Sequence, residues 1–234
     1  HLLDRLPRPG QAVQAKVQRL GHLLADEGGV DSISMRRIAQ ELGVVPMALY
    51  KHVANKDELL DGMIDVVVGE IDPPVEGADW KTTMRERILS ARRALLRHPW
   101  ASRVLESRGE PTPTVIGYMD SMMGIFLAGG FSIDLMHHAM HVMGSRILGF
   151  SQELFDDTSS MPPEEAAEVW TQMADAYPNI AKLIPVAMGT HDEGGSVVGG
   201  GCDDQFEFEF ALDLILDGLE RLRAAGRDGD GRTV

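Results

Sequence analysis

Residues 34–60 read SMRRIAQELGVVPMALYKHVANKDELL, and this stretch contains two short helical patterns on either side of a glycine turn. Ser34 is a favourable N-cap for a helix whose apolar residues recur three and four positions apart. Gly43 tolerates positive φ and ends that helix, while Pro46 suits the first turn of the next one. Two helices joined in this way predict a helix-turn-helix near residues 34–53.

The same stretch gathers cations in a chain that is acidic as a whole. The formal net charge is -14, yet residues 1–60 carry eight Lys and Arg against seven Asp and Glu. The remaining residues therefore carry 14 basic against 29 acidic side chains. This acidic balance argues against a non-specific nucleic-acid coat, but it is compatible with a DNA-binding domain on an acidic body.

The second helix of a helix-turn-helix enters the major groove with its first residues against base edges. Here those residues are Pro46, Met47 and Ala48, which can contact thymine methyl groups but cannot form bidentate hydrogen bonds with a base. Arg36 can reach a base edge or a phosphate, and several neighbours are suited to phosphates. The complete set predicted to contact DNA is Ser34, Arg36, Pro46, Met47, Ala48, Tyr50, Lys51, His52 and Lys56.

The rest of the chain predicts an all-α protein, because apolar spacings are mostly three and four and aromatic residues make up only 6%. The segment DPPVEGAD, residues 72–79, marks a boundary between a DNA-binding domain over residues 1–72 and a larger helical-bundle domain over residues 73–234. Helices are predicted over about 11–27, 80–97, 100–107, 113–129, 132–154, 163–176 and 205–224. The glycine-rich segment 189–205 predicts a flexible loop.

Composition predicts a cytoplasmic protein without membrane segments. The chain has one cysteine, which excludes an intramolecular disulfide framework and suits a reducing compartment. No segment has the pattern of a signal peptide, and no run of about 18 apolar residues occurs.

The helix-turn-helix stretch resembles the TetR-type transcriptional repressors. Their pattern R-x-I-A-x-x-L-G-V-x-x-x-x-L-Y-x-H-[FV]-x-x-K-x-x-L is matched by Arg36, Ile38, Ala39, Leu42, Gly43, Val44, Leu49, Tyr50, His52, Val53, Lys56 and Leu59. Val45 stands where the family often has a capping serine, a change that weakens the helix start by about 1 kcal/mol.

Segments beyond this domain, among them LLRHPWASRV and FEFALDLILDGLERL, resemble the tetracycline-repressor branch of the family. The resemblance implies a homodimer built from the helices near 132–154 and 205–224. It also implies a small effector inside the C-terminal domain, whose binding moves the two DNA-binding domains apart and releases double-stranded operator DNA.

The resemblance also implies pocket positions, but not their ligand. Leu105 stands where the tetracycline repressor has a histidine that anchors a magnesium–drug chelate, and leucine cannot bind Mg²⁺. We therefore expect no metal, no cofactor, and a larger or more apolar effector; the acidic body suggests that it is not strongly anionic. The predicted ligand-binding set is Arg87, Trp100, Leu105, Met119, Met122, Phe126, Met140, His141 and Ser145.

Other patterns leave alternatives open. His137, His138 and His141 form HHxxH, a spacing seen in zinc sites, but a third ligand and a general base are missing from the motif; surface, interface or pocket histidines are the alternatives. The 13 methionines fit either a plain core or an adaptable pocket. No catalytic or phosphate-binding motif is present, so we expect no enzyme. Two rivals remain: a small-molecule-binding or enzymatic helical protein that keeps the helix-turn-helix as a scaffold, and a DNA-bound protein without a ligand.

Overall fold

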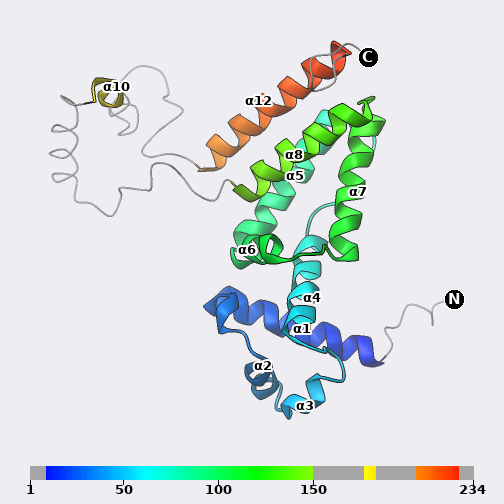
Figure 1. Ribbon diagram of the computed structural model, residues 1–234, viewed down its shortest axis with the longest axis vertical. Coiled ribbons are helices and arrows are strands. Elements are labelled where there is room, and N and C mark those ends of the chain that lie inside the picture. Colours follow the sequence, from blue (N-terminus) through cyan, green and yellow to red (C-terminus); the bar gives the residue numbers. More distant parts are fainter. Residues whose placement is uncertain (1–8, 150–176, 183–203, 227–234) are drawn as a thin grey trace. The chain divides into compact units, whose positions relative to one another are not determined.

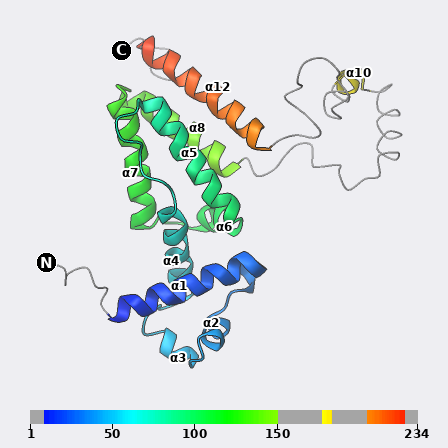
Figure 2. The same cartoon turned by 180° about the vertical axis from the view of Figure 1, so that it is seen from behind.

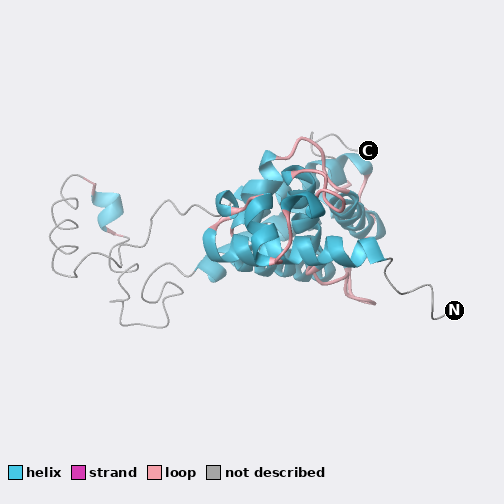
Figure 3. Ribbon diagram, turned by 90° about the horizontal axis from the view of Figure 1, so that it is seen from below, coloured by secondary structure: helices cyan, strands magenta, loops and turns pink. Residues whose placement is uncertain are grey.

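The computed structural model describes residues 9–149, 177–182 and 204–226, and within them the chain forms helices and loops without a strand (Figure 3). This confirms the predicted all-α class. The chain divides into two compact units, residues 1–141 with 222–234 and residues 142–221, and each is described separately.

The first unit begins with the helices of the DNA-binding domain (Figure 1). They are α1 Pro9–Gly28, the 3₁₀ turn η2 Val30–Ser32, α2 Met35–Glu41, α3 Pro46–Leu49 and α4 Lys56–Gly69. Gly43, between α2 and α3, has φ 67°, which is the left-handed conformation expected of it. The predicted helix-turn-helix is therefore present, although its second helix is only four residues long.

The first unit continues with longer helices. They are α5 Trp80–Arg97, α6 Trp100–Ser107, α7 Pro113–Ala128 and the start of α8 Ile133–Gly149. Their bounds agree with the predicted ranges to within one residue for α5, α6 and α7. α5 packs against α7. Gly129 permits the close approach at the end of α7, because a Cβ there would lie 2.7 Å from Trp80.

α4 joins the two groups of helices in this unit. It packs against α1 on one side and against α5, α6 and α7 along its length (Figures 1 and 2). The apolar core of α1 to α4 continues into α5 and α6 through Ala94, Trp100, Ala101 and Val104. A displacement of the α5–α6 region would therefore reach the DNA-binding helices through packed side chains rather than through a loose linker.

In the second unit the structure describes the end of α8, α10 Pro178–Ala181 and most of α12 Asp204–Ala224. α12 carries two apolar rows. Phe208, Leu212, Leu216 and Leu219 are buried, whereas Phe206, Phe210, Leu214 and Leu222 are exposed. The predicted helix over 163–176 and nearly all of the glycine-rich segment lie outside the described residues.

The domain boundary at residue 72 stays a prediction, and it falls in the loop between α4 and α5. None of the helices described here is long and apolar enough to cross a membrane.

Candidate DNA-binding surface and effector site

Two capped helix starts fix the geometry of the helix-turn-helix. The Ser34 hydroxyl accepts a hydrogen bond from the Arg37 amide at 3.2 Å, and the Asn55 side chain accepts one from the Glu58 amide at 2.8 Å. The Glu58 carboxylate in turn accepts from the Ala54 amide at 2.6 Å. Together these bonds satisfy backbone amides on both sides of the N-cap of α4. By contrast, Val45 caps α3 without a side-chain hydrogen bond, as its apolar side chain predicts.

Three cations on this surface are exposed and belong to no ion pair. Arg36, Lys51 and Lys56 are all exposed, and among the described residues no carboxylate is paired with them. Other surface arginines behave differently: Arg108, for example, contacts Asp57 at 3.0 Å. Cations without intramolecular partners lose no ion pair when they neutralise phosphates.

The first turn of α3 is presented to solvent. Met47 is 73% exposed and Tyr50 46% exposed, Pro46 is exposed, and Ala48 and His52 are half-buried. Leu49 and Val53 point the other way and are buried in the core. The predicted DNA-contacting residues therefore lie on the solvent side of a short, well-anchored element.

A different kind of site lies between α5 and α7. Arg87 on α5 is only 8% exposed, and among the described residues it has no carboxylate partner. One guanidinium nitrogen donates to the backbone carbonyl of Asp72, and Nε has no hydrogen-bond partner among those residues. The guanidinium carbon lies 4.9 Å from the centre of the Tyr118 ring. A buried charge without a counter-ion is destabilising, and groups in such environments are found preferentially at functional sites.

Tyr118 is the second polar group of this site, and its role is not predicted from the sequence. Its hydroxyl is buried without a hydrogen-bond partner among the described residues. Burial raises the pKa of Tyr118 to about 12, against the opposing effect of Arg87. The phenol is therefore a neutral hydrogen-bond donor at physiological pH. The burial of the Tyr118 hydroxyl depends on the packing of α5 against α7. No local sequence pattern therefore predicts it.

Two predicted ligand-binding residues continue the same face of α7. Met122 and Phe126 follow Tyr118 at intervals of four residues, and both are buried. Trp80 packs beside Phe126 with ring centres 5.9 Å apart. Three residues of the predicted ligand-binding set, Arg87, Met122 and Phe126, thus lie where α5 packs against α7. Tyr118 and Trp80, which were not in that set, lie there too. We call the group around Arg87 and Tyr118 the candidate effector site.

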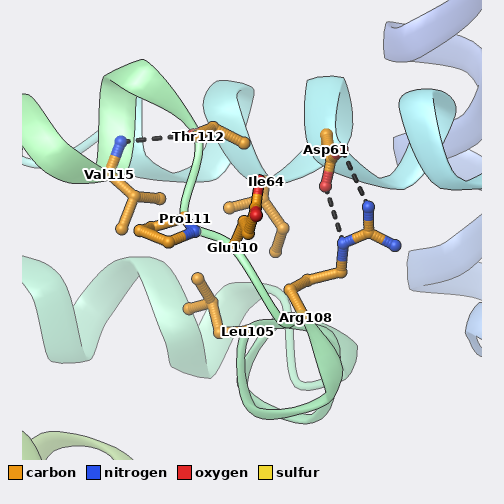
Figure 4. A pocket seen from close by; sticks show the side chains of 8 residues that line it. All are labelled: Asp61, Ile64, Leu105, Arg108, Glu110, Pro111, Thr112 and Val115. Carbon is orange, nitrogen blue, oxygen red and sulfur yellow. Dashed lines mark hydrogen bonds and ion pairs between the residues drawn. The ribbon is translucent and has the colours of Figure 1, made fainter.

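Trp100 and Leu105 do not belong to this group between α5 and α7, and their role in ligand binding stays a prediction. The Trp100 indole N–H donates to Asp26 of α1 at 2.7 Å, so this residue packs with the DNA-binding helices. Leu105 lines a cavity of about 100 Å³, which is well below the 300 Å³ or more of a drug-sized site. Figure 4 shows the cavity beside Arg108 and Asp61, and its lining is Asp61, Ile64, Leu105, Arg108, Glu110, Pro111, Thr112 and Val115.

The remaining predicted residues are less enclosed. Met119 is 40% exposed on the other side of α7, His141 is exposed and Met140 half-buried on α8. The side chain of Ser145 lies outside those that the structure describes.

A helix-turn-helix with exposed, unpaired cations and a buried polar pair in an adjoining helical domain define a ligand-responsive DNA-binding protein. Comparisons with known proteins agree. Residues 22–63 match the family of bacterial regulatory proteins of the tetR type, and residues 73–223 match the tetracyclin repressor-like C-terminal domain. The chain therefore belongs to the tetR family, and it is a ligand-responsive DNA-binding transcriptional regulator.

Individual relatives support this assignment. The chain is 29% identical to the HTH-type transcriptional repressor DrrR1 of Streptomyces coeruleorubidus, over 96% of this chain and 83% of that one. It is 28% identical to the class G tetracycline repressor protein of Vibrio anguillarum, over 86% and 90%. Its structure resembles that of the Streptomyces coelicolor TetR family protein ActR in complex with actinorhodin, with a TM-score of 0.66, 27% identity, and coverage of 92% and 98%.

Proposed function

We propose that this protein is a homodimeric repressor that leaves its operator when an apolar effector carrying one anionic group binds between α5 and α7. The observation that carries the DNA-binding half of the proposal is the exposed set of Arg36, Lys51 and Lys56, none of which is neutralised by a described carboxylate. Similarity to a relative that represses transcription supports repression rather than activation.

On DNA, side-chain chemistry separates the residues that bind phosphates from those that contact bases. Lys51 and Lys56, with the Tyr50 hydroxyl, bind phosphates and fix the register of the domain. Met47 and Pro46 face the base edges, where the methyl group of thymine is the complementary partner. Arg36 is the residue able to form a bidentate contact with guanine.

The effector site refines the expected ligand. The buried Arg87 guanidinium can only donate hydrogen bonds, and the neutral Tyr118 hydroxyl, whose ring lies under Arg87, can donate as well as accept. Their complement is a carboxylate or phenolate, while Met122, Phe126 and Trp80 suit an apolar ring system. The acidic surface suggested a ligand that is not strongly anionic; a single buried anionic group satisfies both observations, since the desolvated cation outweighs distant surface charges.

The effector site is connected to the DNA-binding domain through Asp72. Arg87 donates to the Asp72 carbonyl, the Ser90 hydroxyl donates to its carboxylate at 2.7 Å, and Arg93 does so at 3.0 Å. Asp72 follows the C-cap of α4, whose first turn holds Lys56. An anion that draws Arg87 away from Asp72 therefore changes the restraint on α4, and α4 positions the DNA-binding face.

A second anchor holds the other part of α4. Arg108 donates to Asp57 at 3.0 Å and to Asp61 at 2.8 Å, and Thr112 donates to Asp65 at 2.5 Å. α4 is thus restrained at both ends, so loosening one end turns the helix about the other. This provides the two-state element that ligand-induced release requires.

The dimer is assigned to α8 and α12. Phe206, Phe210 and Leu214 form an exposed apolar row on α12, and such a row on a long helix favours pairing with a second copy. A dimer places two helix-turn-helix units on successive major grooves, about 34–36 Å apart.

The test is a fluorescence-anisotropy titration of the protein against DNA flanking its own coding region, at two salt concentrations. Each candidate effector is an aromatic acid compared with its own methyl ester, which keeps the shape and removes the anion. We expect tight, salt-dependent binding to one DNA segment, and release by an acid but not by its ester. Absence of selective DNA binding would reject the repressor function, whereas release by acid and ester alike would reject only the anionic group.

A further inference from the structure

A cluster of metal-ligating side chains lies where α1 meets the turn between α5 and α6. His22 and Asp26 lie four residues apart on α1, and His98 is the C-cap of α5. The two oxygens of Asp26 face different imidazoles: Oδ1 lies 2.8 Å from His98 Nδ1 and Oδ2 lies 3.4 Å from His22 Nδ1. One ligand atom from each of the three residues lies within 4.8 Å of the others.

The two histidines are enclosed and closely apposed. His22 is 6% exposed and His98 7% exposed, and their ring centres are 4.1 Å apart. His22 Nε2 is buried without a hydrogen-bond partner among the described residues. A packed pair of imidazoles with an unsatisfied nitrogen is unfavourable for a plain core but suitable for a cation.

The residues around the cluster orient it as the outer shell of a metal site does. The Glu70 carboxylate lies 3.2 Å from His98 Nε2, so His98 can donate there and direct Nδ1 toward Asp26. The Trp100 indole N–H donates to Asp26 Oδ1 at 2.7 Å, and Arg97 holds Glu70 at 2.8 Å. A ligating histidine commonly has such a carboxylate on its second nitrogen, and a ligating carboxylate is itself hydrogen-bonded.

We propose that His22, Asp26 and His98 bind a divalent transition-metal ion of the Zn²⁺ type. Two imidazoles and one carboxylate match Zn²⁺, Co²⁺ or Ni²⁺ rather than Mg²⁺ or Ca²⁺, which prefer oxygen. Ligand atoms already this close need shifts of about an ångström to reach bond lengths of about 2.0–2.2 Å. Three protein ligands leave a fourth position for water.

The location of the ion would couple metal binding to DNA binding, independently of the effector. His22 and Asp26 belong to the first helix of the DNA-binding domain, whereas His98 follows α5, which carries Arg87 in the effector site. An ion bound by all three links these elements directly. It stabilises whichever arrangement keeps them together, so metal binding and DNA binding are coupled reciprocally.

The test must separate this cluster from the histidines of α8. His137, His138 and His141 are exposed, and the rings of His137 and His141 lie 4.7 Å apart, so they are a competing weak site. The starting protein is therefore the full chain with His137→Gln and His141→Gln, stripped with a chelator. Zn²⁺ binding is measured by calorimetry, and Co²⁺ binding by the visible absorption of a low-symmetry Co²⁺ ion.

In this background we expect one ion per chain. His22→Gln and Asp26→Asn should each weaken Zn²⁺ binding more than about tenfold, because each removes a ligand, and Glu70→Gln should weaken it about 10–100-fold through His98. His52→Gln, at a half-buried histidine outside the cluster, is the matched control and should leave the affinity unchanged. Circular dichroism verifies that each variant is folded.

Three outcomes would overturn the proposal. The first is loss of all binding when only His137 and His141 are replaced. The second is a Zn²⁺ affinity that is the same in the background protein and in folded His22→Gln or Asp26→Asn. The third is a Co²⁺ spectrum identical to that of the hexa-aqua ion. If His22→Gln does not fold, Asp26→Asn and Glu70→Gln still decide the question. The measurement uses no DNA or effector, so its result is independent of the repressor proposal.

Discussion

The DNA-binding domain and the effector site use burial in opposite ways. In the helices α1 to α4, apolar side chains such as Ile38, Leu49 and Leu59 are fully enclosed, and the cations Lys51 and Lys56 stay in solvent. Between α5 and α7, a guanidinium and a phenol are buried together with two polar atoms unsatisfied among the described residues. The first arrangement buries apolar side chains and exposes cations, whereas the second buries a cation without a described counter-ion, which we propose is neutralised by the effector.

The two regions should therefore respond differently to substitutions. A core built mainly of apolar side chains, like that around Leu49, loses stability when one of them is truncated, whereas the exposed surface tolerates substitution. A site that buries an uncompensated charge does not depend on that charge for stability, since an apolar residue of similar volume removes the desolvation penalty as well. The predictions below test the contrast, beginning with the largest expected effect.

Replacing Leu49 by alanine should destabilise the protein most. Leu49 is 2% exposed in the core, and truncating a buried leucine lowers the free energy of unfolding by about 2–5 kcal/mol. Urea denaturation measures the change. The matched control is Met47→Ala in the same helix, where the side chain is 73% exposed and the free energy should change by no more than about 0.5 kcal/mol. Equal losses in both variants would show that α3 is not anchored through Leu49.

Arg87→Met should separate stability from response. It removes the hydrogen bond to Asp72 but also the buried charge, so the free energy of unfolding should change by less than about 1.5 kcal/mol. Because the variant also lacks the Arg87–Asp72 restraint on α4, DNA binding should weaken without any effector, and an acidic effector should shift the remaining binding at least about tenfold less. Tyr118→Phe, which deletes one donor, is the milder companion. A destabilisation as large as that of Leu49→Ala would mean that Arg87 is a structural residue, and the contrast between the regions would fail.

How much of this was predictable from sequence also differs between the regions. The caps at Ser34 and Asn55 and the glycine turn were predictable, because capping and positive φ are local properties of the chain. The pairing of Arg87 with Tyr118 depends on how α5 packs against α7, and no local pattern encodes it. Likewise, no local pattern predicts that the Trp100 indole donates to Asp26, a partner 74 residues away in sequence.

Lys56→Ala should weaken DNA binding uniformly across sequences. An exposed lysine that neutralises one phosphate adds about one unit to the slope of log affinity against log salt, per subunit. The measurement is anisotropy at several salt concentrations, with Lys16→Ala on α1 as a control of equal charge. Lys16 is exposed on a helix outside the helix-turn-helix, so its loss should leave the slope nearly unchanged. If the two variants behave alike, net charge rather than the DNA-binding face governs affinity.

The smallest effect concerns acid stability at Asp72. Hydrogen bonds from Ser90 and then Arg93 lower the pKa of the Asp72 carboxyl below its ordinary value of 3.8. A lowered carboxyl pKa gives stability that is fully present above the unfolded value and is lost as the pH falls through the folded value. Asp72→Asn should therefore lower the Tm slightly near neutral pH and flatten its decline below about pH 4. Asp120→Asn, at an exposed carboxylate on α7, is the control and should keep the wild-type profile.

Because Asp72 is exposed, water and salt screen its contribution, and the difference in Tm should shrink further as salt is added. A difference that does not shrink with salt would mean that the loss is not electrostatic, and the hydrogen bond from Ser90 would then be the main contribution of the Asp72 side chain.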